Sequence, residues 1–255
     1  MKLLFWNVRG LSSPLKQKTL AKLCKDQDCS LVCILETKLD EAKLQQLMDS
    51  FFRGWKFFHN FLNHPNGRIL CIWNPLVVEF QLKEVTLQTL TGSVSDRSSN
   101  RHFTLTAVYG LYSIRNRKSL WDSLINLAHS MTGPWIVCGD FNCPLNAEDR
   151  IGIRPVSDYE TADFKSCCLI SQLSDIPSTG CMYTFAANNV KSKLDRALMN
   201  AAGFAAKWQV SAHFFPPGSA SDHSPCILEL GRQQFRKRQF QIERYGVITP
   251  TSEKW

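Results

Sequence analysis

Two apolar runs that stop abruptly at polar residues constrain the fold of this chain most strongly. Leu31 to Leu35 is an unbroken apolar segment followed by Glu36, and Trp135 to Cys138 is followed by Gly139 and Asp140. Short apolar runs of this kind, bounded by polar residues, indicate buried β-strands. The polar residues then lie at strand ends, where loops gather side chains from distant parts of a sequence into one site.

The same arrangement recurs along the chain. Predicted strands precede or contain further polar residues: Asn7, Tyr109, Asn142, Asp195, and the triplet Ser221-Asp222-His223. Several carboxylates, two amides and a histidine delivered in this way suit metal-assisted attack on a phosphodiester. Such a reaction needs hard oxygen ligands for Mg²⁺, a group that activates water, and donors for the developing charge.

Helices alternate with strands in the hydrophobic pattern. Apolar residues at helical spacing predict helices over 16–28, 40–52, 116–129 and 158–169, the last with Asp158 as its N-cap. Strands are predicted over 56–59, 68–73, 77–82, 102–109, 193–199 and 225–230, with a tight turn at Asn66-Gly67 and a mobile polar loop over 92–100. This mixture predicts an α/β sandwich.

Composition excludes several classes of protein. With 255 residues, 44% of them hydrophobic and 20% charged, the chain suits one large globular domain rather than a disordered segment. It contains no apolar stretch of about 18 residues that could span a bilayer, and its first residues lack a signal-peptide cleavage site. The ten cysteines include strand-embedded Cys33, Cys71 and Cys138, and we expect reduced core thiols. We therefore expect an intracellular protein with no membrane partner.

Positive charge gathers at the end of the chain. The formal net charge is +8, and the segment from Gly231 to Trp255 holds six Lys/Arg and two Glu, a net +4. Such a bias fits a polyanionic partner such as DNA. We divide the chain into a domain over 1–230 and a basic tail or linker remnant over 231–255, which either solubilises the protein or contacts DNA.

Seven motifs carry a family resemblance in a fixed order. They are Phe5-Trp6-Asn7-Val8-Arg9-Gly10-Leu11, Glu36-Thr37-Lys38, Val108-Tyr109-Gly110, Gly139-Asp140-Phe141-Asn142, Tyr183-Thr184-Phe185, Lys193-Leu194-Asp195-Arg196 and Ser221-Asp222-His223-Ser224-Pro225. From about Met1 to Leu230 the chain resembles the endonuclease/exonuclease/phosphatase superfamily. It is most similar to the apurinic-type endonuclease domain of plant LINE (non-LTR) retrotransposons.

This resemblance implies a fold, an activity and a setting. The implied fold is a four-layered α/β sandwich, in which two mixed sheets pack face to face between outer helices. The implied activity is hydrolysis of DNA phosphodiesters with Mg²⁺, or Mn²⁺ in its place, which nicks one strand and leaves a 3′-hydroxyl. In the parent element a reverse transcriptase domain would follow, and we expect a monomeric protein in the nucleus.

Site roles also come from the resemblance. Glu36 is expected to be the main metal ligand, with Asn7 assisting and Asp222 near the metal. Tyr109 would donate its hydroxyl to the scissile phosphate, and Asp195 would orient His223. Either Asp140 or His223 would take the proton of the attacking water, a choice that the sequence leaves open. Asn142 would hold that water or donate to a phosphate oxygen.

DNA or phosphate contacts are expected from Arg9, Lys38 and the hairpin carrying Asn188, Asn189 and Lys191. Arg9 stands where apurinic endonucleases carry an aspartate, which removes one ligand of a second metal site. Guanidinium binds phosphate in a bidentate fashion. The hairpin would probe the groove near the scissile bond. Phe185, in place of the usual tryptophan, and the lone Gly67 are further departures.

Two other functions remain open from the sequence. One is a phosphomonoesterase of the same superfamily, although no dedicated basic loops around a small pocket are identifiable. The other is a catalytically inactive nucleic-acid-binding remnant, against which the intact acidic, amide and histidine positions argue.

Overall fold

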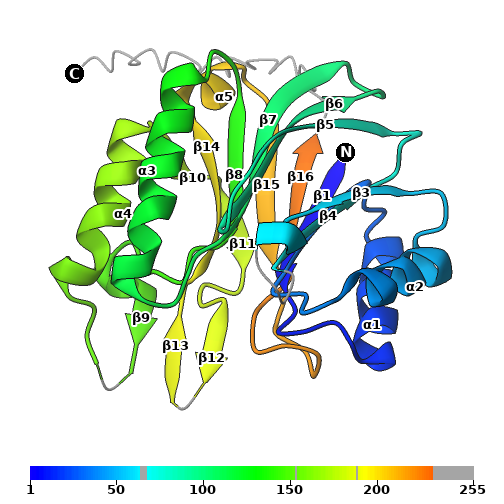
Figure 1. Ribbon diagram of the computed structural model, residues 1–255. Helices are drawn as coiled ribbons and strands as arrows, with labels where there is room; N and C mark the ends of the chain where they lie inside the picture. Colours follow the sequence, from blue (N-terminus) through cyan, green and yellow to red (C-terminus); the bar gives the residue numbers. More distant parts are fainter. Residues whose placement is uncertain (64–67, 153, 188, 232–255) are drawn as a thin grey trace, which may run out of the picture.

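A computed structural model describes residues 1–63, 68–152, 154–187 and 189–231 of the chain. It contains two large mixed sheets that pack face to face, with a pair of long helices on the outer side of each (Figure 1). The predicted four-layered α/β sandwich is therefore confirmed. None of the helices in the described ranges is long and apolar enough to cross a membrane.

The first sheet has seven strands and contains the chain's opening strand near its centre. In spatial order they are β11 (Ser178–Gly180), β15 (Gln209–Phe214), β16 (Cys226–Gly231), β1 (Lys2–Asn7), β2 (Leu31–Leu35), β4 (Ile69–Trp73) and β3 (Lys56–His59). β1 and β2 run parallel, with Asn7 opposite Leu35, so both strands end at the same edge.

The second sheet has six strands, in the order β10 (Leu173–Asp175), β14 (Asp195–Asn200), β8 (Trp135–Asp140), β7 (Arg101–Tyr109), β6 (Thr89–Asp96) and β5 (Val78–Val85). β7 and β8 are parallel, which places Tyr109 beside Asp140. β14 is antiparallel to β8, so Asp195 at its start also lies opposite Asp140.

A third, small sheet extends below the two large ones as drawn in Figure 1. It consists of β12 (Phe185–Ala187), β13 (Val190–Ser192) and β9 (Arg150–Ile151). The hairpin predicted over 186–192 is thus confirmed in its strands, and Asn188 lies outside the described residues.

The helices are α1 (Pro14–Asp26), α2 (Glu41–Phe51), α3 (Ile114–Ser130), α4 (Asp158–Ile170) and α5 (Ala201–Ala205), with 3₁₀ turns at Phe61–Asn63 and Ala147–Asp149. α1 and α2 cover the outer face of the seven-stranded sheet through Leu20, Leu44 and Leu47. α3 and α4 cover the six-stranded sheet through a stack of Trp121, Phe164 and Phe141. Each helix pair buries one apolar stripe, as expected for amphipathic helices.

Two local predictions were wrong. Residues 92–96 belong to β6 rather than to a loop, because β6 pairs with β5 on one side and β7 on the other. Gly92 in this strand lies where a Cβ would come within 2.4 Å of the Phe80 ring. The N-cap of α4 is Ser157 rather than Asp158, because the Ser157 hydroxyl accepts from the Glu160 amide in a capping box.

The core lies between the two sheets, and it contains most of the strand-embedded cysteines. All ten cysteines are free thiols and nine of them are buried, which confirms the expectation of reduced core residues. The described domain ends at Gly231 with β16, while the basic tail over 232–255 and the turn at Asn66-Gly67 lie outside the described residues.

Candidate active site

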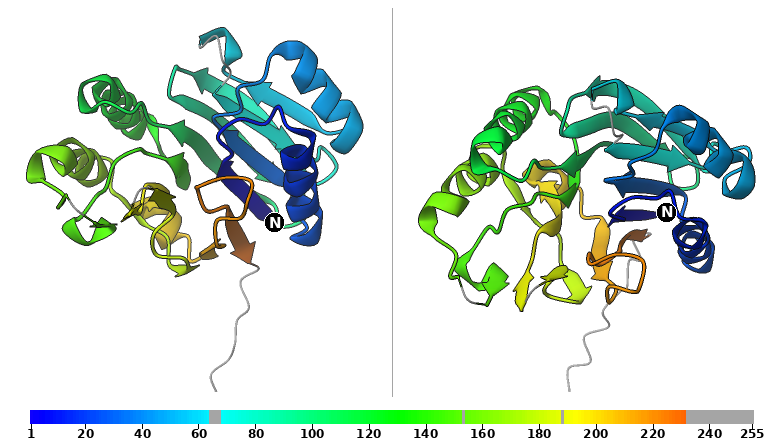
Figure 2. Two further views of the ribbon diagram at one scale, coloured as in Figure 1. Left: turned by 90° about the horizontal axis from the view of Figure 1, so that it is seen from below. Right: turned by 60° about the horizontal axis from the view of Figure 1, so that its bottom comes forward.

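The polar strand ends predicted from the sequence meet at one edge of the sandwich. Asn7 and Glu36 come from the ends of β1 and β2, and Tyr109 and Asp140 come from the ends of β7 and β8. The loop between β15 and β16 brings His223 across to them. Figure 2 views the molecule from this edge, with the β15–β16 loop beside the end of β1.

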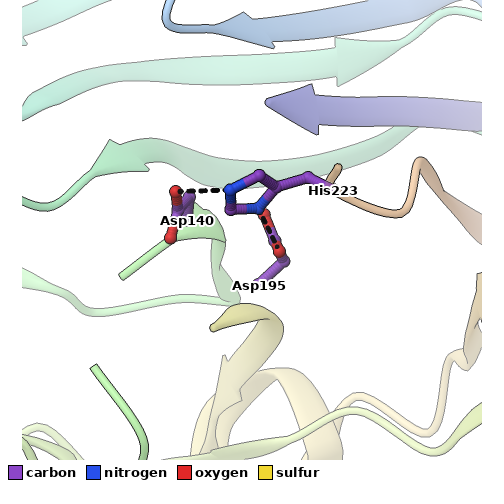
Figure 3. A group of neighbouring side chains, drawn as sticks. All are labelled: Asp140, Asp195 and His223. Carbon is purple, nitrogen blue, oxygen red and sulfur yellow. Dashed lines mark hydrogen bonds and ion pairs between the residues drawn. The ribbon is translucent and has the colours of Figure 1, made fainter. Parts of the chain in front are cut away.

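His223 lies between two buried carboxylates, as Figure 3 shows. Its Nδ1 is 2.8 Å from Oδ2 of Asp195, and its Nε2 is 3.8 Å from Oδ2 of Asp140. Asp140 and Asp195 are fully buried, and His223 is 2% exposed. The expected pairing of Asp195 with His223 is therefore present in the structure.

Several contacts that the sequence did not reveal hold this group in place. The Trp6 indole nitrogen donates to the backbone oxygen of His223 at 2.9 Å, and the His223 amide donates to the Ser221 hydroxyl. The Phe185 ring packs against the imidazole with centroids 4.9 Å apart. The Thr184 hydroxyl accepts from the backbone amide of Asp195 at 2.9 Å. Thr184 and Phe185 therefore position the histidine and its carboxylate partner.

Asp140 is oriented by two amide groups. The Asn7 side-chain nitrogen donates to Oδ2 of Asp140 at 2.8 Å, and the Asn142 backbone amide donates to Oδ1 at 2.8 Å. Asn7 Oδ1 accepts from the Arg9 amide, while the Asn142 side chain donates to the Gly110 oxygen at 2.7 Å. In this arrangement both asparagines position their neighbours, and the expected metal and phosphate roles of Asn7 and Asn142 remain predictions.

Glu36 forms the centre of a second, more open cluster. Its carboxylate accepts from the Tyr109 hydroxyl at 3.1 Å and pairs with Lys38 at 2.7 Å. Arg9 lies 3.9 Å from Glu36 and 3.2 Å from Asp222. The Glu36 and Asp222 side chains are 10% and 29% exposed, whereas those of Arg9 and Lys38 are 48% and 54% exposed, so the cations cover the acids on the solvent side.

Three residues of this cluster, and Asn142 beside Asp140, have a left-handed backbone conformation. Arg9, Glu36, Lys38 and Asn142 have φ values of 50°, 52°, 52° and 48°. Residues other than glycine rarely adopt this left-handed conformation, and they keep it where the surrounding structure compels it, often at functional sites. Arg9, Glu36 and Lys38 thus adopt this uncommon conformation where their side chains meet.

Burial and nearby charges shift the pKa values of Asp140 and His223. Burial raises the pKa of Asp140 to about 7, and the nearby charge of Asp195 adds to this effect. Burial lowers the pKa of His223, but the charges of Asp195 and Asp140 outweigh it and raise that pKa to about 9. These shifts favour the charged imidazolium form of His223 and make the Asp140 carboxylate a stronger proton acceptor than an exposed aspartate.

Glu36 behaves differently from Asp140. Burial by itself raises the pKa of this carboxyl, yet the hydrogen bond and charge of Lys38, together with Arg9, bring the pKa below its ordinary value. Glu36 is thus an anion at neutral pH. Burial raises the pKa of Tyr109 well above its usual value, with the Glu36 charge contributing, so its hydroxyl remains a donor.

The donor set fits a hard divalent cation. Glu36 and Asp222 offer carboxylate oxygens near the surface, and Oδ1 of Asp222 is a buried atom without a hydrogen-bond partner in the described part of the chain. Asp140, Asp195 and His223 also lie close enough together to hold an ion. Because Asp195 and His223 already bind each other at 2.8 Å, we regard the Glu36–Asp222 cluster as the better candidate for a metal site.

Two further cations belong to the site although sequence reasoning did not single them out. The Lys16 Nζ donates to the backbone oxygens of Val8 and Arg9 at 2.8 and 3.3 Å. The Arg68 guanidinium lies 5.0 Å from the centre of the Tyr109 ring. Neither residue stands in a recognisable motif, and only the fold brings them to the strand ends.

The hairpin residues lie apart from the carboxylates. Asn189 and Lys191 are exposed on the β12–β13 hairpin, whose base bridges to His223 through Phe185. β9 pairs with β13 and supports it, and a cavity of about 510 Å³ opens between them. Asn189 and Lys191 therefore lie beside the site, to which the hairpin contributes Phe185.

Comparison with protein families gives a match over most of the chain. The model of the Endonuclease/Exonuclease/phosphatase family matches residues 4–223. An exodeoxyribonuclease of Bacillus subtilis (strain 168) is 25% identical over 173 residues, which cover 64% of this chain and 66% of that protein. The chain thus spans slightly less than two thirds of that relative.

Solved structures share the fold. The endonuclease domain of TRAS1, a telomere-specific non-LTR retrotransposon, superposes with a TM-score of 0.67 at 13% identity, covering 90% of this chain and 97% of that one. The 3′ phosphatase NExo from Neisseria, bound to a product DNA hairpin, superposes with a TM-score of 0.67 at 18% identity, covering 91% and 99%.

Proposed function

The chain belongs to the endonuclease/exonuclease/phosphatase family, whose members act on phosphoester bonds, and we propose that it is a divalent-metal-dependent endonuclease of the retrotransposon type. It would nick one strand of DNA and leave a 3′-hydroxyl. The observation that carries this proposal is the placement of His223 between Asp195 and Asp140, next to the Glu36–Asp222 acid cluster.

Each side chain has a role that follows from its contacts. Asp140, oriented by Asn7 and the Asn142 amide, accepts the proton of the attacking water. His223 is held by Asp195 and stabilises negative charge on the phosphate as an imidazolium. Tyr109 donates its hydroxyl to a phosphate oxygen when that oxygen replaces Glu36 as acceptor.

Glu36 and Asp222 would hold the cation, with Asn7 fixing the adjoining loop through the Arg9 amide. A bound divalent ion supplies Lewis-acid stabilisation of the transferring phosphoryl group. An all-oxygen donor set favours Mg²⁺, with Mn²⁺ as a substitute.

DNA is the substrate that best suits the rest of the molecule. The formal net charge of +8 favours association with a polyanion. The hairpin beside the site exposes Asn189 and Lys191, whose polar side chains are accessible to a DNA duplex.

The test is nicking of supercoiled plasmid by the full chain, with Mg²⁺ and with EDTA as the control. We expect relaxed circles with Mg²⁺ only, and extension of the nick by a DNA polymerase without prior end repair, because the 3′ end carries a hydroxyl. An intact plasmid together with release of phosphate from a 3′-phosphorylated oligonucleotide would instead identify a phosphomonoesterase. No reaction of either kind by the folded protein would identify an inactive nucleic-acid-binding relic.

A further inference from the structure

Two cations, Arg9 and Lys38, cover the Glu36 and Asp222 carboxylates on their solvent side. Lys38 pairs with Glu36 at 2.7 Å, and Arg9 bridges Glu36 and Asp222 at 3.9 and 3.2 Å. These carboxylates are the ligands assigned above to a divalent ion. A cation that neutralises a ligand from the same direction as a metal competes with that metal for it, because like charges repel at short range.

Backbone hydrogen bonds join the two loops that carry these cations. The Gly10 amide donates to the Glu36 oxygen and the Leu11 amide to the Thr37 oxygen, each at 2.8 Å. Lys16 binds the Val8 and Arg9 oxygens from the other side. The Arg9 and Lys38 side chains remain about half exposed, so they are accessible to a ligand that approaches from solvent.

We propose that Arg9 and Lys38 are resident counter-cations of Glu36 and Asp222, and that a DNA phosphate releases these carboxylates for metal binding by drawing the two cations onto itself. This inference rests on the proposed function. It makes metal binding and DNA binding cooperative, with Arg9 and Lys38 as the residues that link them.

The chemistry of the two side chains supports this exchange. Guanidinium forms bidentate hydrogen bonds with a phosphate, and an ammonium group binds phosphate as a point charge. The Glu36 side chain is only 10% exposed, so a phosphate that approaches from solvent is a more accessible partner for both cations. Because linkage is reciprocal, DNA must raise the metal affinity by the same factor by which metal raises the DNA affinity.

The experiment measures Mn²⁺ binding to the full chain by electron paramagnetic resonance of the free ion. It uses the parent, Arg9→Gln, Lys38→Gln, the double variant, and Glu36→Gln as a check on the site. Arg97→Gln is the matched control, because Arg97 is 55% exposed, pairs with Glu79 at 3.4 Å, and follows β6 at the end of the sheet opposite the site. Each protein is titrated with and without a short duplex of phosphorothioate DNA, which resists hydrolysis.

We expect Arg9→Gln and Lys38→Gln to bind Mn²⁺ at least about fivefold more tightly than the parent and Arg97→Gln, in the range of coupling between adjacent sites. The duplex should tighten Mn²⁺ binding to the parent and to Arg97→Gln by a similar factor, and should have much less effect on the double variant.

Unchanged Mn²⁺ affinity in folded Arg9→Gln and Lys38→Gln would overturn the inference, as would full DNA linkage in the double variant. If Glu36→Gln abolishes Mn²⁺ binding in either of those cases, the metal site of the proposed function still stands. If Glu36→Gln leaves Mn²⁺ binding intact, the metal site and the counter-cation role both fail.

Discussion

The indole nitrogen of Trp6 donates a hydrogen bond to the backbone oxygen of His223 at 2.9 Å, across 217 positions of sequence. Trp6 lies in β1, one residue before Asn7, and His223 lies in the loop before β16. Because β1 and β16 are neighbouring strands, this bond fixes the loop that carries His223 to the sheet that carries Asn7. His223 is thus attached to the same sheet that carries Asn7 and whose strand β2 precedes Glu36.

Replacing Trp6 with Phe removes this donor while it keeps an aromatic ring in the core. A net hydrogen bond contributes about 1 kcal/mol, so we expect a loss of about that size in the free energy of unfolding and a five- to tenfold fall in nicking rate. Urea unfolding and single-turnover nicking measure the two effects. Trp121→Phe is the control. It replaces an indole on the buried face of α3 that stacks on Phe164, and it should leave the nicking rate per folded molecule unchanged.

Asp195→Asn removes the charge that holds the His223 imidazolium. We expect the nicking rate to fall at least about a hundredfold, and the same for Asp140→Ala and His223→Ala, the scale of losing one acid–base or transition-state contact. Asp122→Asn, on the exposed side of α3, is the control for loss of a carboxylate. Near-parent rates in the folded Asp140→Ala and His223→Ala proteins would remove both residues from the mechanism.

A buried ion pair stabilises the strand that carries Asp195. Arg196 is fully buried, binds Asp149, and lies 2.6 Å from Asp175. Arg196→Met leaves the Asp149 charge buried without this partner, so we expect a loss of about 3–5 kcal/mol in the free energy of unfolding. Adding Asp149→Asn should recover part of that loss, as urea titration can show. A loss below about 1 kcal/mol would mean that the pair is dispensable.

The capping box of α4 should give stability that depends on pH. Burial raises the pKa of Glu160, but the Ser157 amide and the Arg150 guanidinium bind the ionised carboxylate and bring its pKa below the ordinary value. A depressed pKa in the folded state contributes stability above the unfolded pKa of about 4.3, and this contribution disappears as pH falls through the folded pKa.

We therefore expect the parent to exceed Glu160→Gln in stability by about 1 kcal/mol at pH 7, with the difference shrinking from about pH 5 downward. Denaturant unfolding of both proteins at several pH values measures this difference. A gap that stays constant to pH 3 would show that the charge of Glu160 is not involved.

The β12–β13 hairpin should influence where DNA is cut rather than how fast. Replacing Asn189 with Gly and Lys191 with Ser, together with Asn188→Gly at a position outside the described residues, leaves every carboxylate of the site untouched. We expect nick positions along a long duplex to redistribute, because polar hairpin side chains favour DNA of particular groove width or flexibility. The rate at a single preferred site should fall only modestly. Identical nick maps for variant and parent would exclude target selection by the hairpin.

The sequence by itself determined the strands that end in functional residues. The apolar runs before Glu36 and Asp140 became β2 and β8, because an unbroken apolar run is stable only when both faces of its strand are covered. The parallel pairing of β1 with β2 and of β7 with β8, which the structure supplies, then brings Asn7, Tyr109 and Asp140 to one edge.

Only the tertiary structure decided which polar groups act on which. The Asp195 and Asp140 positions around His223, the Trp6 anchor, and the counter-cation positions of Arg9 and Lys38 depend on distances between segments that no local pattern encodes. β6 became a strand because two neighbours supplied its hydrogen bonds, although its Ser, Gly and Asp residues favour a loop. Strand pairing and the packing of Phe80 against Gly92 are non-local interactions, and they outweighed the local loop propensity of this segment.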